Sequence, residues 1–189
     1  MKTCLLVIDV QESFTRRPYY SAVDVASFLA SQNELISGCL VAGVPVVRVF
    51  HVEPGGADHP FAMASGLVRP LPGLMPFTEA LVVHKTRHSA LVGTELLVWL
   101  IQHGVQRLIV SGIRTEQCCE TTTRHGSDLG FDVIFVPEAT LTFEMRLPDG
   151  SAFLPADIKA RTASVLAGRF AEVMGVQRAL AAVADLTLA

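Results

Sequence analysis

Apolar runs of strand length alternate along this chain with segments whose apolar positions recur at helical spacing. The runs that predict strands are residues 4–8, 44–49, 80–83, 108–113 and 133–136. Helical spacing covers about 22–42, 94–103, 115–129 and 156–170, and a short terminal strand and helix are expected within 173–184. Because this alternation is typical of parallel sheets covered by helices on both faces, it predicts an α/β fold.

Glycines and long irregular segments divide these elements. Gly43 and Gly104 stand where a glycine commonly ends a helix, each a few residues before the next predicted strand. Two segments, 53–78 and 138–155, fit neither helix nor strand, and the first is rich in proline and glycine. Since long loops in a compact domain usually form lids or pocket walls, we expect these segments to border a site.

Composition narrows the classes of protein and partner. The chain has 189 residues, of which 50% are hydrophobic and 17% charged, and its formal net charge is −3. This length predicts one domain spanning residues 1–189, and the lack of a basic field argues against nucleic acid and anionic membrane surfaces as partners. We therefore expect the partners to be a small-molecule substrate and further copies of this chain.

The cysteines and the start of the chain indicate the compartment. The four cysteines, Cys4, Cys39, Cys118 and Cys119, show no CxxC spacing and no disulfide-rich pattern. A run of only five apolar residues leads into Asp9, too short for a signal peptide, and no apolar run reaches the length of a membrane span. The sequence therefore predicts a cytoplasmic protein with reduced thiols.

Cys118 follows a buried strand at a position suited to nucleophilic chemistry. The strand 108–113 precedes it, Thr115 is a candidate N-cap, and the helix that would start there ends at Gly130. In the first turn of that helix, unpaired backbone N–H groups would lower the pKa of the thiol below its usual value of about 8.5 and hold an oxyanion. The alternative is that Cys118 and Cys119 are small buried apolar residues.

Two further polar side chains follow predicted strands. Asp9 comes directly after the run 4–8, and Lys85 comes after the run 80–83. Ligands of open parallel sheets bind beyond the carboxyl ends of the strands, so Asp9, Lys85 and Cys118 can converge there, with Asp9 as a base and Lys85 as a fixed positive charge. Taken singly, Asp9 is equally compatible with a turn or helix cap, and Lys85 with a solvated strand edge.

Three segments of the chain carry short motifs in a fixed order. They are Leu6-Val7-Ile8-Asp9-Val10-Gln11 with Phe14, Lys85 with Ser89-Ala90 and Gly93-Thr94-Glu95-Leu96, and Gly112-Ile113-Arg114-Thr115 with Cys118, Thr122, Arg124 and Gly130. These segments resemble motifs of the isochorismatase-like cysteine hydrolases, a family that includes nicotinamidases and N-carbamoylsarcosine amidases. Each motif alone is loose, but together their order and separations are specific, and the resemblance covers nearly the whole chain.

This resemblance implies a three-layer α/β/α fold around a mostly parallel sheet of about six strands, and a catalytic triad of Asp9, Lys85 and Cys118. It also implies a cis peptide bond between Ile113 and Arg114, with the backbone N–H groups of Arg114 and Cys118 forming an oxyanion hole. The implied protein is a homo-oligomer that needs no organic cofactor. Its reaction is hydrolysis of a C–N bond in a small amide or carbamoyl compound through a thioester.

The chain departs from the nicotinamidase pattern at the metal site. Nicotinamidases bind a metal through an Asp-x-His pair and further histidines, whereas Val49 here replaces the aspartate before His51. His51, Glu53 and His59 remain as candidate ligands, although a histidine after a strand is more often a structural hydrogen-bond partner. We therefore expect no metal, and a substrate other than nicotinamide.

The motifs also suggest roles for neighbouring residues. Arg114 is a candidate for binding a substrate carboxylate, or else an exposed or interface arginine, and Phe14 is a candidate pocket wall, or else a core residue. Cys119 lies about 100° around the helix from Cys118 and should pack away from the site. A disulfide between these neighbours would be strained, which argues against a redox switch.

Two other functions remain open beside amide hydrolysis. Isochorismatases in the strict sense cleave a vinyl ether without a nucleophilic thiol, so Cys118 argues against that or another non-amide reaction on the same scaffold. A non-catalytic small-molecule-binding protein would have no need of Asp9, Lys85 and Cys118 together. Loss of turnover on replacement of Cys118 with alanine distinguishes the cysteine hydrolase from both.

Overall fold

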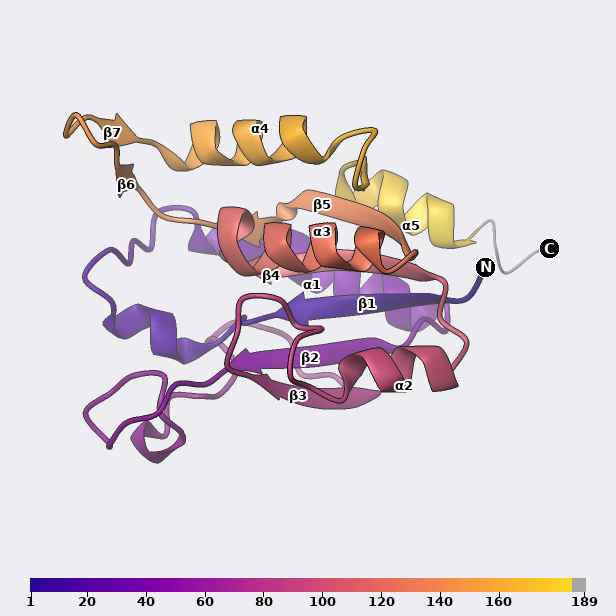
Figure 1. Cartoon of the computed structure of the whole chain (residues 1–189), viewed down its shortest axis with the longest axis horizontal. Coiled ribbons are helices and arrows are strands. Elements are labelled where there is room, and N and C mark those ends of the chain that lie inside the picture. Colours follow the sequence, from indigo (N-terminus) through magenta and orange to yellow (C-terminus); the bar gives the residue numbers. More distant parts are fainter. Residues whose placement is uncertain (185–189) are drawn as a thin grey trace.

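The centre of the structure, a computed structural model that describes residues 1–184, is a six-stranded sheet in the order β3-β2-β1-β4-β5-β8 (Figure 1). Its strands, all parallel, are β1 (Thr3–Ile8), β2 (Val46–His51), β3 (Leu81–Lys85), β4 (Arg107–Ile113), β5 (Asp132–Leu141) and β8 (Glu172–Val173). The predicted parallel α/β fold is therefore confirmed, with β3 at one edge of the sheet.

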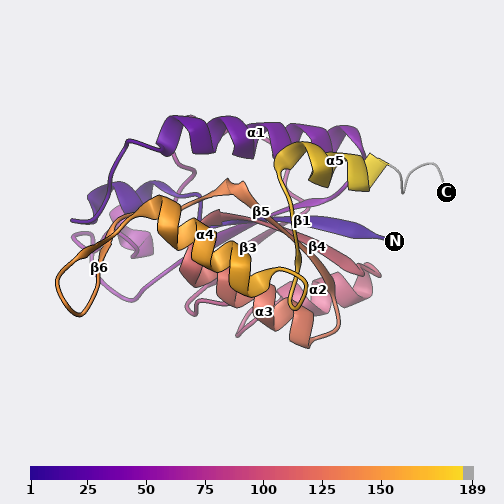
Figure 2. The ribbon, with the colours of Figure 1, turned by 90° about the horizontal axis from the view of Figure 1, so that it is seen from above.

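Helices cover both faces of this sheet, so the molecule has three layers (Figure 2). On one face lie α1 (Val25–Val41) and α5 (Val176–Ala184), and on the other lie α2 (Leu96–Gln102), α3 (Glu120–Asp128) and α4 (Pro155–Leu166). Leu35 and Ile36 of α1 are buried in the apolar cluster on one face, and Leu96 and Leu100 of α2 in the cluster on the other. The predicted α/β/α arrangement is confirmed.

Some helix ends agree with the predicted ones and others differ. Gly43 and Gly104 take the left-handed conformation expected of glycines that end helices, with φ of 71° and 64°. The first long helix begins at Val25 rather than near residue 22. The fourth ends at Leu166 rather than near residue 170, because the chain turns at Gly168, whose φ is 70°. No helix in the described part of the chain is long and apolar enough to cross a bilayer.

The two segments predicted to be irregular both begin near the end of the sheet where the strands finish. Segment 53–78 contains the short 3₁₀ helix η2 (Met63–Ser65). Segment 138–155 holds the end of β5 and a small hairpin of β6 (Met145–Arg146) and β7 (Ala152–Phe153), so β5 is longer than predicted. A third irregular segment follows β1 and contains the 3₁₀ helix η1 (Glu12–Arg16).

β1 and β4 come very close together near their carboxyl ends. Gly112 has φ of 127°, and a Cβ atom at this position would lie 1.9 Å from the Ile8 carbonyl oxygen, so only glycine fits. The strand order also reverses here, because β1 leads to β2 on one side while β4 lies on the other. In open parallel sheets this reversal forms a crevice for ligands, and Asp9 and Cys118 follow the two strands that border it.

Candidate active site

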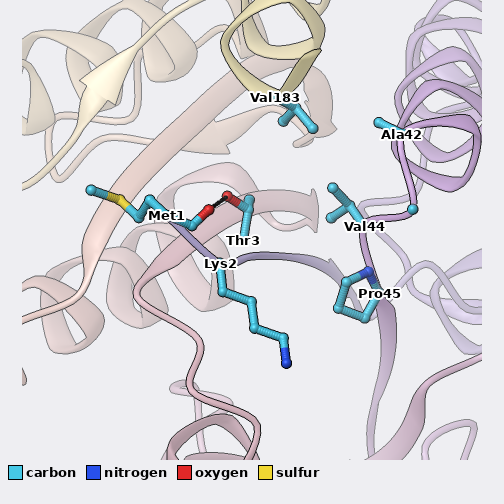
Figure 3. A pocket seen from close by; sticks show the side chains of 8 residues that line it. Met1, Lys2, Thr3, Ala42, Val44, Pro45 and Val183 are labelled. Carbon is cyan, nitrogen blue, oxygen red and sulfur yellow. Dashed lines mark hydrogen bonds between the residues drawn. The ribbon is translucent and has the colours of Figure 1, made fainter. Parts of the chain in front are cut away.

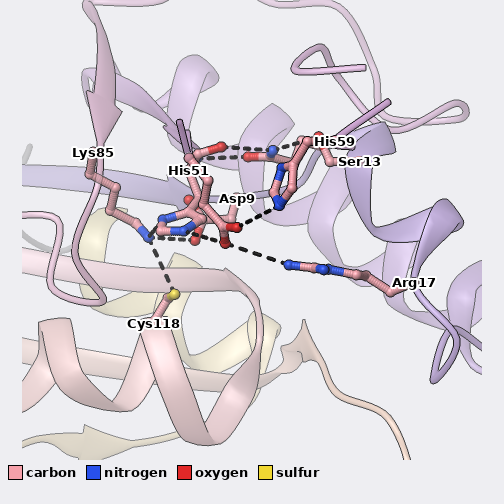
Figure 4. Close-up of polar contacts among 9 residues, drawn as sticks. Asp9, Ser13, Arg17, His51, His59, Lys85 and Cys118 are labelled. Carbon is pink, nitrogen blue, oxygen red and sulfur yellow. Dashed lines mark hydrogen bonds and ion pairs between the residues drawn. The ribbon is translucent and has the colours of Figure 1, made fainter. Parts of the chain in front are cut away.

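Three polar side chains from separate strand ends meet at the crevice between β1 and β4 (Figure 4). Lys85 Nζ lies 2.7 Å from Asp9 Oδ2 and 3.2 Å from Cys118 Sγ. Asp9 and Lys85 are fully buried, and Cys118 is 7% exposed. Asp9 has φ of 52°, a left-handed conformation that is uncommon outside glycine and concentrates at functional sites. The structure thus brings together the three residues that the sequence motifs singled out.

Besides its ion pair with Asp9 and its hydrogen bond to Cys118, the Lys85 ammonium group donates to His51 Nδ1 at 3.3 Å. Because Nδ1 accepts, the ring proton lies on Nε2, which donates to Glu53 Oε1 at 3.2 Å. Burial and the Lys85 charge hold the pKa of His51 below its ordinary value, so the ring is neutral. Burial alone would lower the pKa of Lys85, but Asp9 and Cys118 more than offset it, raise that pKa and keep the ammonium charged.

Gln11 holds the backbone at His51 and was missed as a site residue in the sequence. Its Oε1 accepts a hydrogen bond from the His51 N–H at 2.8 Å, and its Nε2 donates to the His51 carbonyl at 3.0 Å and to Ser13 Oγ at 2.8 Å. The side chain is fully buried. Its place in the opening motif was the available signal, but the partner lies 40 residues away and no local pattern identifies it.

The turn that carries Cys118 is π-helical, η3 (Thr115–Cys119), and not the first turn of an α-helix. Arg114, in an extended conformation, stands at the N-cap position without a side-chain cap. Thr115 instead donates from Oγ1 to Thr140 Oγ1 at 2.8 Å. The predicted Thr115 cap is therefore wrong, because a partner on β5 takes its hydroxyl group.

The pKa of the Cys118 thiol is raised well above its ordinary value. Burial is the largest cause, the Asp9 carboxylate adds to it, and the Lys85 charge offsets only part of the rise. The predicted low pKa of this thiol is therefore wrong, because burial of the sulfur raises the pKa and a position at the start of a helix does not offset it. The thiol is protonated at neutral pH and needs a base to become a nucleophile, and Asp9 lies beside it.

Alkylation of Cys118 by iodoacetamide should keep accelerating as the pH rises from about 7 to about 9, because the thiolate fraction grows roughly tenfold per pH unit below the pKa. Mass spectrometry of the alkylated protein measures the rate at each pH. A rate that stops rising below about pH 8.5 would contradict this prediction. Asp9→Asn should speed the reaction, since it removes one cause of the raised pKa. Cys118 should react first, because Cys4, Cys39 and Cys119 are 0% exposed.

The Arg114 side chain is not directed at a substrate as predicted. It is 6% exposed, pairs with Glu116 Oε1 at 2.9 Å and donates to the Phe143 carbonyl at 3.4 Å. The Tyr19 ring covers it, with its centroid 4.9 Å from the guanidinium carbon. The predicted carboxylate-binding role of this side chain is corrected accordingly, because Glu116 already neutralises its charge. The peptide bond between Ile113 and Arg114 is cis.

A cavity of about 110 Å³ lies against Cys118. Phe14 and Phe61 line it as an edge-to-face pair with centroids 5.0 Å apart. The other lining residues are Asp9, Arg17, Tyr19, His51, Glu53, His88 and Gln117. Phe14 is therefore part of the wall, as predicted, and it packs into the core as well. At about 30 Å³ for each water molecule, the space is that of roughly four waters, which suits a short ligand.

A larger hollow, about 180 Å³, opens at the opposite edge of the sheet, where the strands begin (Figure 3). Its described lining includes Lys2, Thr3, Val44 and Pro45 and brings no carboxylate or thiol to the space. The described lining of this hollow therefore lacks the carboxylate and thiol that line the cavity at the carboxyl ends of the strands.

Glu53 contacts the two other candidate metal ligands, His51 and His59, but the three side chains do not form a metal site. Its Oε1 accepts from His51, and its Oε2 lies 3.2 Å from His59 Nε2. Both ring nitrogens of His51 are engaged, one by Lys85 and one by Glu53, so neither has a lone pair free for a cation. Within residues 1–184 no group of three or more such side chains has an arrangement that could hold a metal ion. The residues present do not fit a nicotinamidase-type metal.

Cys119 faces away from the cavity, in agreement with the sequence prediction. It is 0% exposed and belongs to the apolar cluster that includes Leu108 and Phe135. It forms no disulfide with Cys118, and both thiols are free. Its role in the described structure is packing.

The fold is shared with known proteins. The family model of the isochorismatase domain matches residues 3–177. A streptothricin hydrolase from Streptomyces noursei is 30% identical over 172 residues, which cover 90% of this chain and 67% of that protein. Nicotinamidase 3 from Arabidopsis thaliana is 29% identical over 160 residues, 78% of this chain and 77% of that protein. The solved structure of a proposed isochorismatase from Burkholderia xenovorans has a TM-score of 0.88 and 30% identity, and the match covers 97% of this chain and 88% of that one. This chain belongs to the isochorismatase family.

Proposed function

We propose that this chain is a cytoplasmic cysteine hydrolase that cleaves a C–N bond in a small amide or carbamoyl compound. The main support is the Lys85 ammonium group, which contacts a buried carboxylate and a buried thiol beside a cavity of small-molecule size. Burying such groups costs free energy, so chemistry explains the cluster better than packing does. Relatives named streptothricin hydrolase and nicotinamidase add further support.

In the first half of the proposed reaction, Cys118 Sγ attacks the acyl carbon while Asp9 accepts the thiol proton. The new S–C bond pushes the carbonyl π electrons onto oxygen, and the backbone N–H groups of Arg114 and Cys118 stabilise this oxyanion. Collapse of the tetrahedral intermediate breaks the C–N bond. The departing nitrogen takes the proton from Asp9 and leaves as ammonia or an amine, and the acyl group remains as a thioester.

In the second half, water attacks the thioester and gives its proton to Asp9. A second tetrahedral intermediate breaks its C–S bond, the carboxylic acid leaves, and the sulfur recovers a proton from Asp9. Negative charge passes between the Asp9 carboxylate, the sulfur and the oxyanion during this cycle. Lys85, which contacts the carboxylate and the sulfur, remains charged and stabilises negative charge on either.

The reaction class is tested by screening short amides, ureas and carbamoyl compounds for ammonia release. The wild-type chain should hydrolyse at least one of these compounds. The Cys118→Ala variant should hydrolyse none of them. Nicotinamide should be a poor substrate, because no group of side chains within residues 1–184 has an arrangement that could hold the metal that nicotinamidases bind. Failure to release ammonia or amine from every compound of these classes would overturn the proposed function.

We also propose that the protein works as a homo-oligomer. Val82, on the edge strand β3, is 40% exposed, and Val98 and Ile101 on α2 are 56% and 65% exposed. Apolar side chains exposed beside a sheet edge are typical of surfaces that pack against another copy. Sedimentation at micromolar concentration should show an oligomer that Ile101→Glu weakens, and a wild-type monomer under these conditions would contradict the proposal.

A further inference from the structure

Arg17 places a guanidinium group in the same cavity as the Cys118 sulfur. Its guanidinium carbon lies 4.8 Å from the centroid of the Phe61 ring, a cation–π contact that holds the group against the wall. Its ion pair with Glu53 is 3.5 Å long, beyond normal hydrogen-bond length. The Nε atom is buried and has no hydrogen-bond partner among the described residues. A buried donor without a partner is costly, and an acceptor group on a ligand would satisfy it.

The two arginines near the site differ in how fully they are paired. The Arg114 guanidinium has a carboxylate at 2.9 Å, a backbone carbonyl at 3.4 Å and an aromatic cover, and it does not line the cavity. The Arg17 guanidinium lines the cavity, makes one long ion pair and is 30% exposed. A ligand anion therefore has access to Arg17 and not to Arg114.

Glu53 can release Arg17 and still keep one histidine nitrogen beside each of its oxygens. Its Oε1 also accepts from His51 Nε2, and its Oε2 lies against His59 Nε2, each at 3.2 Å. Both oxygens therefore keep one partner when Arg17 turns to a ligand. The exchange replaces a 3.5 Å ion pair with a shorter, charge-assisted contact.

On the basis of the proposed hydrolase activity, we infer that Arg17 determines specificity and that the substrates are short amides carrying a carboxylate a few bonds from the scissile carbonyl. The carboxylate replaces Glu53 beside the guanidinium and accepts from Nε and a terminal nitrogen, a geometry that suits the planar fork of arginine. Because Cys118 and Arg17 line one cavity of about 110 Å³, a short molecule can reach both.

The first test compares iodoacetate with its neutral isostere iodoacetamide as alkylating agents of Cys118. The measured quantity is the rate with iodoacetate divided by the rate with iodoacetamide, normalised to the same ratio for glutathione. It should be about tenfold higher in the wild type than in Arg17→Gln. Arg17→Lys should give an intermediate ratio, because it keeps the charge and loses the fork. Arg16→Gln, which removes a charge from an exposed neighbour outside the cavity, should match the wild type. Equal ratios in Arg17→Gln and the wild type would overturn the inference.

The second test uses succinamate and its neutral counterpart succinamide as substrates. Arg17→Gln should raise KM for succinamate about ten- to a hundredfold, with little change in kcat, and should leave succinamide nearly unaffected. Calorimetry of succinamate binding to Cys118→Ala, with and without Arg17→Gln, measures the contact between Arg17 and the carboxylate in the absence of turnover. Binding that depends on Arg17 but is never followed by hydrolysis would reject the proposed function alone. Hydrolysis without preference for the anion would reject the role of Arg17 alone, as would a preference for cationic amides.

Discussion

Replacing Cys118 with alanine should lower kcat/KM for any accepted amide by on the order of 10⁴-fold or more, because the covalent route loses its nucleophile. Ligand binding should persist, since the substitution removes one sulfur atom from the cavity wall and leaves the 2.7 Å pair of Asp9 and Lys85 in place. Ammonia release measures the loss of turnover, and calorimetry with the same amide shows whether the cavity still binds it.

Cys119→Ala is the matched control for this variant. Cys119 is equally close in sequence but is 0% exposed and packs in an apolar cluster, so its removal should cost about 1 kcal/mol of stability and leave turnover nearly unchanged. Turnover that survived in Cys118→Ala would indicate a reaction without a nucleophilic thiol, such as vinyl-ether hydrolysis. Equal losses in the two variants would point to a folding defect instead.

The convergence of Asp9, Lys85 and Cys118 could be predicted because it depends on sheet topology more than on side-chain detail. Each residue follows an apolar run, and the carboxyl ends of parallel strands share one edge of a sheet. Any order of these strands in one parallel sheet brings such residues to that edge. The three layers were expected from the family resemblance, and the helix ends at Gly43 and Gly104 from the preference of glycine for such positions.

The role of Arg114 could not be predicted because it depends on where its neighbours point. The sequence shows Glu116 two residues on, but the direction of both side chains is set by the turn η3 and by Phe143 from the segment after β5. Burial of Cys118 has a similar origin, since the depth of the sulfur depends on packing from several elements. Local sequence patterns therefore identified Arg114 and Cys118 as site residues. They did not predict that Glu116 pairs with Arg114 or that burial raises the pKa of Cys118.

The contacts that distinguish Arg17 join parts of the chain that no short pattern connects. Phe61 and Glu53 lie in the irregular segment after β2, and Arg17 lies in the segment after β1. Neither segment has a periodic pattern that would predict its path. The expectation that long loops form pocket walls held for both Phe61 and Glu53, while the identity of the cation facing the cavity required the folded arrangement.

Replacing Lys85 with methionine should lower the free energy of unfolding by about 3–5 kcal/mol, in addition to lowering turnover. Methionine fills a similar volume, but it leaves the fully buried Asp9 carboxylate without its counter-charge. Asp9→Asn in the same background removes that orphaned charge, so the double variant should recover much of the lost stability. Urea unfolding at one fixed protein concentration measures all four members of this cycle.

Arg69→Met is the control for loss of an ion pair, because Arg69 pairs with Glu12 at 2.5 Å while it is 60% exposed. Water can replace that partner, so the loss of stability should be far smaller than in Lys85→Met. Equal losses would show that the Asp9–Lys85 pair is not desolvated. A double variant no more stable than Lys85→Met would assign the loss to the contacts of Lys85 with His51 and Cys118. Since turnover should stay low in the double variant while stability returns, the cycle separates what the pair does for folding from what it does for chemistry.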